Sequence, residues 1–80
     1  MLERRQVPRH PVLASAEIVL SGTKPVPCFV RNLTPSGARL RLGEETVLPA
    51  AFPLRLLDAG RTELAQLIWQ NGTSVGVRFS

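Results

Sequence analysis

Proline and glycine occur at short intervals along the whole chain, and this spacing constrains the fold more than any other sequence feature. Seven Pro and six Gly divide the 80 residues into segments of strand length, and none is long enough for a good helix. The chain is therefore predicted to be all-β, with roughly six short strands joined by tight turns. These strands are expected to close into a small antiparallel barrel, because closure leaves no exposed edge strand.

Alternating apolar and polar residues indicate where the strands lie. The segments that read as strands or extended chain cover residues 12–20, about 26–33, 38–42 and 52–57. The third of these directs Arg39 and Arg41 to one side, opposite its apolar residues. Turn residues separate the segments at Ser21-Gly22, Thr34-Pro35-Ser36-Gly37 and Asp58-Ala59-Gly60.

The dipeptide Asn71-Gly72 is the strongest short signal for a type I′ hairpin turn. With these two residues as the loop, Trp69 opposes Ser74, and Gly76 lies diagonally across from Trp69. The indole ring would then stay open as a stacking platform, unless it caps the barrel or fills the site of a helix. The core face of this hairpin is expected to collect Leu64, Ile68, Val75, Val77 and Phe79.

The length allows one domain, over residues 1–80, and excludes a two-domain enzyme. Within it we expect a barrel over residues 12–80, preceded by an arm over residues 1–11. Residues suited to catalysis are few, because the chain has one His, one Cys and no Tyr. His10 has no neighbour in sequence that would complete a metal site or a Ser-His pair. The chain is therefore predicted to be neither an enzyme nor a metal protein.

The single cysteine, Cys28, excludes an intrachain disulfide and is expected to pack as a small core residue. A reducing cytoplasm is the default location for such a chain. The N-terminus lacks the apolar core of a signal peptide, and no later stretch approaches the roughly 18 apolar residues of a membrane span. We therefore expect a cytoplasmic protein that does not insert into a membrane.

Half of the net charge of +4 lies in residues 1–10, where Arg4, Arg5 and Arg9 stand against Glu3 alone. Arginine suits planar, two-pronged contacts and stacking better than diffuse attraction to phosphate. We expect this segment to be a flexible arm that an anion organises.

A second group of polar residues, Asn32-Leu33-Thr34-Pro35-Ser36-Gly37, ends one expected strand and forms the turn to the next. Asn32 and Thr34 fall on the same side of the strand, so an amide and a hydroxyl are able to converge on one ligand. Gly37 would supply a positive φ in the turn and let a backbone approach closely. Taken singly, the arm reads as a solvated tail and this segment as an ordinary turn.

Together the two groups resemble the paired motifs of the PilZ domain family, bacterial receptors for cyclic di-GMP. That family has R-x-x-x-R in an N-terminal arm and [D/N]-x-S-x-x-G at a barrel strand, which correspond here to Arg5 and Arg9, then Asn32, Thr34 and Gly37. The ending Gly76-Val77-Arg78-Phe79 is similar to the family's Gly-[Val/Ile]-x-Phe finish. Thr34 stands in place of the commoner Ser. Many members continue into a C-terminal helix, which is expected to be absent or minimal here.

The resemblance implies a receptor for cyclic di-GMP that needs no other cofactor. Arg5 and Arg9 would hold guanine and phosphate from the arm, while the barrel residues close on the ligand from the other side: Asn32, Thr34 and Gly37. Ordering of the arm by the ligand would change the surface offered to a downstream protein partner. The receptor itself would be a monomer or a homodimer.

Further residues are candidates for the same ligand. Arg4 adds a third cation to the arm, and Trp69 offers a flat ring on which a base is able to stack. Arg39 and Arg41 either flank the site or are solvated strand residues.

Two other functions are compatible with this sequence. One is a protein-interaction module that keeps the PilZ fold and binds no nucleotide. The other is a small basic barrel that binds RNA or single-stranded DNA. The chain has only four aromatic residues, however, and most of them fall in core positions, so DNA or RNA binding is not expected.

Overall fold

The structure is a computed structural model that describes residues 14–80. This part of the chain forms six strands and no helix: β1 (Ala14–Ile18), β2 (Val26–Thr34), β3 (Gly37–Leu42), β4 (Ala51–Leu56), β5 (Arg61–Asn71) and β6 (Ser74–Phe79). None of these described residues therefore belongs to a helix long and apolar enough to cross a membrane. The arm predicted over residues 1–11 lies outside the described residues.

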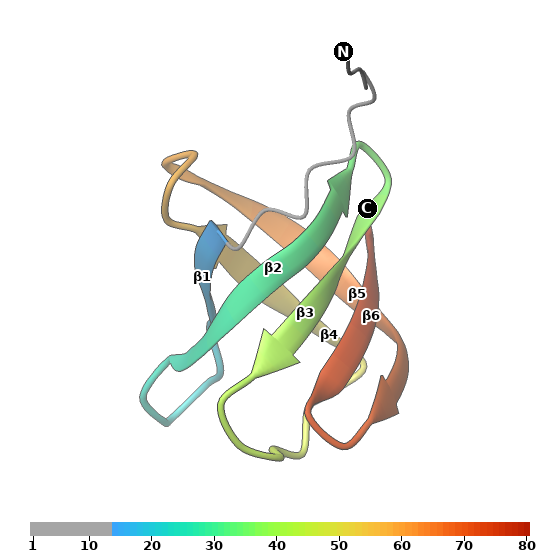
Figure 1. Cartoon of the computed structure of the whole chain (residues 1–80). Coiled ribbons are helices and arrows are strands. Elements are labelled where there is room, and N and C mark those ends of the chain that lie inside the picture. Colours follow the sequence, from blue (N-terminus) through green and yellow to red (C-terminus); the bar gives the residue numbers. More distant parts are fainter. Residues whose placement is uncertain (1–13) are drawn as a thin grey trace, which may run out of the picture.

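The six strands close into an antiparallel barrel in the order β1-β2-β3-β6-β5-β4, and β4 pairs back with β1 (Figure 1). This confirms the predicted all-β class and the six-stranded barrel. Every strand of the closed wall has two hydrogen-bonded neighbours, so the barrel presents no unpaired strand edge. Strands β2, β3 and β6 lie side by side, and this part of the wall contains the residues of the candidate site.

The core contains one side of each strand, as the alternation of the sequence predicts. In β4 every second residue is buried, and the same holds for the apolar side of β3, opposite Arg39 and Arg41. The largest fully buried side chains are Phe52, Ile18, Leu40, Leu54, Val30 and Val75. No polar or charged side chain among residues 14–80 is buried, so all of their charge lies on the outer surface.

Two strands contain a β-bulge, which the sequence did not reveal. In β2, Val30 pairs with Leu40 and Asn32 pairs with Arg39, so Arg31 is the extra residue. A bulge offsets the period-two alternation by one residue and re-aims the side chains after it. Arg31 and Asn32 therefore both lie on the outer surface, although Val30 directly before them is buried.

The predicted register of the last hairpin is wrong, because its turn lies one residue later than expected. The turn consists of Gly72 and Thr73, since Asn71 pairs with Ser74. Gly72 has a positive φ of 63° and Thr73 does not, which is the pattern of a type II′ turn and not of type I′. A two-residue loop with Gly first is equally compatible with strand twist, so the Asn-Gly signal located the turn one residue too early.

The second bulge, in β5, changes the core face of the hairpin. Leu67 pairs with Val77 and Trp69 pairs with Gly76, so Ile68 is the extra residue of β5. Leu64 and Ile68, which were expected in the core, are 50% and 55% exposed. Their expected places are taken by the buried Ala65 and the partly buried Leu67.

Two smaller expectations are also corrected. Strand β1 ends at Ile18, two residues before the predicted end of that segment at residue 20. Gly37 does not have a positive φ, which occurs only at Gly22, Gly60 and Gly72 among the described glycines. Gly37 is required for a different reason, because a Cβ there would collide with the carbonyl oxygen of Val77 on β6.

Candidate functional site

One row of residues crosses four adjacent strands on the outer surface of the barrel. Asn32 on β2 pairs with Arg39 on β3, Arg39 pairs with Gly76 on β6, and Gly76 pairs with Trp69 on β5. The two residues at the ends of this row, Asn32 and Trp69, each directly follow a β-bulge. Bulges are frequent beside functional sites because they redirect side chains. Here they bring an amide, a guanidinium and an indole onto the same face.

The indole of Trp69 lies over Gly76 and does not project freely. A Cβ built on Gly76 would fall among the Nε1, Cε2 and Cδ1 atoms of the indole. The absent side chain thus provides the space that the ring occupies, and Gly76 is buried beneath it although it is on the outer face. Gly76 is directly opposite Trp69, not diagonal to it as predicted.

The position of the ring leaves part of it available for contact. Trp69 remains 42% exposed, and together with Arg39, Ile68 and Gly76 it lines a shallow hollow of about 240 Å³. A ring packed on one side and open on the other is a suitable surface for a planar partner.

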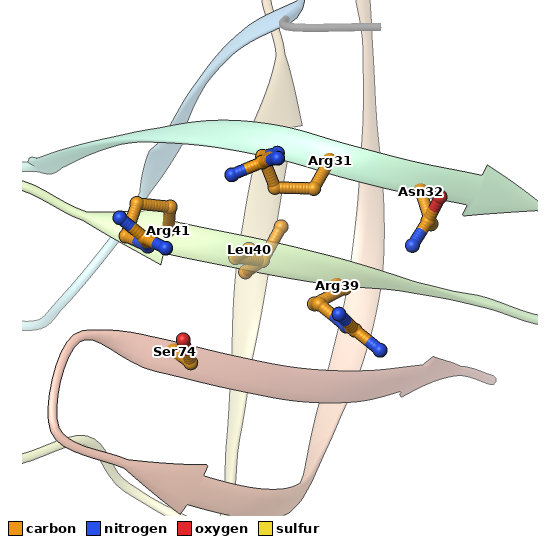
Figure 2. Close-up of a pocket in the computed structure, with 6 residues that line it drawn as sticks. All are labelled: Arg31, Asn32, Arg39, Leu40, Arg41 and Ser74. Carbon is orange, nitrogen blue, oxygen red and sulfur yellow. The ribbon is translucent and has the colours of Figure 1, made fainter. Parts of the chain in front are cut away.

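A second hollow, of about 190 Å³, lies on the other side of Arg39. Figure 2 shows its lining residues, which come from β2, β3 and β6: Arg31, Asn32, Arg39, Leu40, Arg41 and Ser74. Arg39 belongs to both hollows and connects them. Because the side chain of Leu40 is fully buried in the core, this hollow is bounded mainly by polar side chains.

The arginines of the barrel divide into two groups by their partners. Arg55 pairs with Glu17 across β4 and β1 at 3.3 Å, and Arg61 pairs with Glu63 along β5 at 3.2 Å. The remaining arginines make no ion pair with any carboxylate of residues 14–80: Arg31, Arg39, Arg41 and Arg78. All four lie on β2, β3 and β6, and three of them line the 190 Å³ hollow. This part of the wall is therefore positively charged, whereas the β1-β4-β5 part is balanced.

Thr34, a predicted ligand residue, uses its hydroxyl inside the turn between β2 and β3. Its Oγ1 accepts hydrogen bonds from the backbone N–H groups of Ser36 and Gly37, at 3.3 and 3.2 Å. The same oxygen lies 3.3 Å from the Ser36 hydroxyl. A threonine hydroxyl bound in this way fixes the shape of the turn. The shape of this turn sets where β3 begins, and Arg39 and Arg41 project from that strand.

The structure brings some of the predicted site residues together. Others lie in the part of the chain that it does not describe. Asn32 and Trp69 occupy the same row, and Gly37 lies two residues along β3 from Arg39. The arm residues Arg4, Arg5 and Arg9 lie outside the described residues. Sequence reasoning missed Arg31 and Ser74, because their position beside Arg41 depends on how β3 pairs with β2 and β6, which the local pattern does not reveal.

The thiol of Cys28 lies in the core, as predicted. It is 4% exposed, and desolvation by burial raises its pKa to about 11, with a smaller contribution in the same direction from the carboxylate of Glu17. A thiol with a raised pKa is a poor nucleophile at neutral pH. Among residues 14–80, no group of three or more His, Cys, Asp or Glu side chains is arranged to hold a metal ion.

An apolar hollow of about 310 Å³ lies on a neighbouring part of the wall, next to β1 and β2. Phe29 and Leu57 line it and are 50% and 44% exposed. It contains none of the residues of the row and offers few polar groups for a charged ligand.

Compared with known protein families, the chain matches no family model, and no curated protein matches it either.

Proposed function

We propose that this protein is a receptor for cyclic di-GMP of the PilZ type. The observation that carries the proposal is the row in which Arg39 lies between Asn32 and Trp69, on a part of the barrel where arginines have no carboxylate partners among residues 14–80. The motif resemblance and the six-stranded barrel are compatible with it, and neither identifies the ligand.

The chemistry of the row suits a guanine base. Guanine presents O6 and N7 as adjacent acceptors, which one guanidinium is able to fill with two hydrogen bonds. In this proposal Arg39 makes that contact, the open face of Trp69 stacks on a base, and the amide of Asn32 contacts a polar edge of the ligand. An adenine would place an amino donor where guanine has O6, so the Arg39 fork discriminates against it.

The arm supplies the remaining contacts. Arg5 and Arg9, with Arg4 beside them, would neutralise phosphates from the side opposite the barrel. Fixing the backbone of such a segment costs about 1–2 kcal/mol per residue, so we expect a Kd of about 1 µM, near −8 kcal/mol. Closure of the arm over the ligand would change the surface that a protein partner meets.

Calorimetric titration of the full chain with cyclic di-GMP tests this function. We expect a saturable isotherm, and much weaker binding of the adenine counterpart. Arg39→Gln is expected to weaken binding by about 1–3 kcal/mol, which is the discrimination that one two-pronged arginine contact provides. Arg5→Ala and Arg9→Ala should each abolish binding and leave the circular dichroism of the barrel unchanged.

The matched control is Arg55→Gln, which removes the same charge from a position paired with Glu17. It should leave the Kd within about twofold, because exposed ion pairs and distant charges contribute little. No heat with folded protein at tens of micromolar ligand would exclude the receptor function. Equal losses in Arg39→Gln and Arg55→Gln would instead indicate that only total charge matters.

A protein-interaction module that binds no nucleotide is the second candidate. It is favoured by the apolar hollow beside Phe29 and Leu57, which suits a protein surface better than a nucleotide. If variants with substitutions in the row still bind a protein partner, that result would favour this function.

A further inference from the structure

The 190 Å³ hollow has two ends that differ in chemistry. Arg39 and Asn32, which belong to the row, form one end, and Arg31, Arg41 and Ser74 form the other (Figure 2). The side chain of Arg31 extends back along β2 toward the Arg41 end. The function proposed above uses only the first end.

The fold holds the second end in place without any ligand. Arg41 on β3 pairs directly with Ser74 on β6, so the register brings a guanidinium and a hydroxyl onto the same outer face. Arg31 on β2 faces the same side, because it directly follows the buried Val30, and it lines the same hollow. All three residues belong to strands of the closed barrel, which positions them more precisely than a loop would.

The charges at this end are not compensated within the described part of the chain. No carboxylate of that part lines the hollow, and neither Arg31 nor Arg41 forms an ion pair with residues 14–80. Neighbouring guanidinium groups repel each other, and an anion placed between them removes this repulsion and gains charge-assisted hydrogen bonds. Arginine forks match the geometry of a phosphate group, and the Ser74 hydroxyl adds one more donor.

The size of the hollow limits what enters it. Pockets that hold a whole small molecule occupy about 300–1,000 Å³. The hollow of about 190 Å³ is smaller, so it accommodates one charged group and not a complete nucleotide.

We propose that Arg31, Arg41 and Ser74 form a phosphate-binding pocket that takes the phosphate group of a small molecule, whether or not a base is attached. The pocket uses the end of the hollow that lies opposite Asn32 and Arg39, and it does not depend on cyclic di-GMP being the ligand of the row. The phosphate comes either from the nucleotide itself or from a separate small phosphate compound.

Titration of the full chain with pyrophosphate at fixed, moderate salt tests the pocket. The NMR signals of the Arg31 and Arg41 Nε–H groups and of the Ser74 amide should shift together and saturate. Arg41→Gln is expected to weaken the affinity for pyrophosphate at least fivefold. Arg41→Lys keeps the charge but loses the two-pronged geometry, and it should weaken the affinity at least twofold. The control Arg61→Gln, whose guanidinium is engaged by Glu63, should change the affinity less than twofold.

Two results would overturn the proposal that this pocket binds phosphate. One is a shift that does not saturate and spreads over all the arginines, as in general attraction of a polyanion. The other is an equal weakening by Arg41→Gln and Arg61→Gln. Circular dichroism of each variant ensures that a loss reflects binding, since Arg41 is exposed and its replacement leaves the core intact.

A parallel titration separates this proposal from the receptor function. Trp69→Leu should weaken the affinity for cyclic di-GMP and leave the affinity for pyrophosphate within twofold of the wild-type value. If the wild-type chain binds pyrophosphate through Arg41 and ignores cyclic di-GMP, the receptor function fails and the pocket stands. If both ligands bind, competition between them assigns the pocket to the nucleotide's own phosphate, and simultaneous binding assigns it to a separate phosphate compound.

Discussion

Replacement of Gly76 by alanine should destabilise the barrel, although Gly→Ala changes in strands usually do the opposite. Glycine weakens a strand interior, and its replacement by alanine typically stabilises by about 0.4–1 kcal/mol where the backbone allows it. At Gly76 the new methyl group would lie inside the indole of Trp69. The clash involves the middle of a rigid ring, so a small side-chain adjustment does not relieve it.

The structure sets the size of this effect. Trp69 is 42% exposed, so more than half of its surface is covered. A packed tryptophan buries roughly 150–250 Å². Because only somewhat more than half of the Trp69 surface is covered, its contacts at about 25 cal/mol per Å² contribute on the order of 2–4 kcal/mol. Swinging the ring away loses part of this energy, and keeping it in place forces backbone shifts that cost about 1–3 kcal/mol. We therefore expect Gly76→Ala to lower the free energy of unfolding by about 1–3 kcal/mol.

Urea unfolding monitored by circular dichroism measures this loss, and the emission of Trp69, the single tryptophan of the chain, reports the position of the ring. We expect a lower urea midpoint and a red-shifted emission in the folded variant. Gly43→Ala is the matched control, because no atom lies within 4 Å of a Cβ at that position and its φ is not positive. A Gly76→Ala variant with wild-type midpoint and emission would refute the packing of the indole on Gly76.

Three further substitutions test other parts of the structure by urea unfolding. Gly37→Ala should cost about 1–3 kcal/mol because its methyl group meets the carbonyl oxygen of Val77, and a neutral effect would contradict that close approach. Leu54→Ala, at a fully buried site, should cost about 2–5 kcal/mol, whereas a loss below about 1 kcal/mol would mean that the core collapses around the change. Cys28 links stability to pH: burial raises the pKa of its thiol from the ordinary value of 9.0 to about 11, so its contribution is complete below pH 9 and is lost as the pH rises to 11. Cys28→Ala should remove this part of the pH dependence, and an unchanged slope between pH 9 and 11 would contradict the burial of the thiol.

Local pattern was sufficient for most of the barrel wall. The alternation in β3 and β4 identified which residues enter the core, because one side of a strand in a small closed barrel must be apolar. Cys28 and the turn at Gly60 were located for similarly local reasons: a small apolar thiol packs inside, and a glycine supplies the positive φ of 67° observed there. The hairpin at Gly72 was recognised, but its register was not, since a shift of one residue in the loop leaves the local signals unchanged.

The sequence predicted only part of the candidate site. Asn32 and Trp69 were singled out as separate residues, and their common row was not foreseen because the bulges at Arg31 and Ile68 break the period-two alternation. The reason for Gly37 was also different from the expected one. It depends on the approach of β6, which is distant in the chain.

The sequence by itself determined that residues 14–80 fold into six strands around an apolar core, because the period of the apolar residues and the spacing of Pro and Gly allow little else. Only the tertiary structure decided where the charge acts. Closure of the barrel pairs β3 with β6, two bulges turn Asn32 and Trp69 outward, and the carboxylates of Glu17 and Glu63 pair with arginines elsewhere on the wall. Contacts between residues this distant in sequence depend on strand register, which no local pattern encodes.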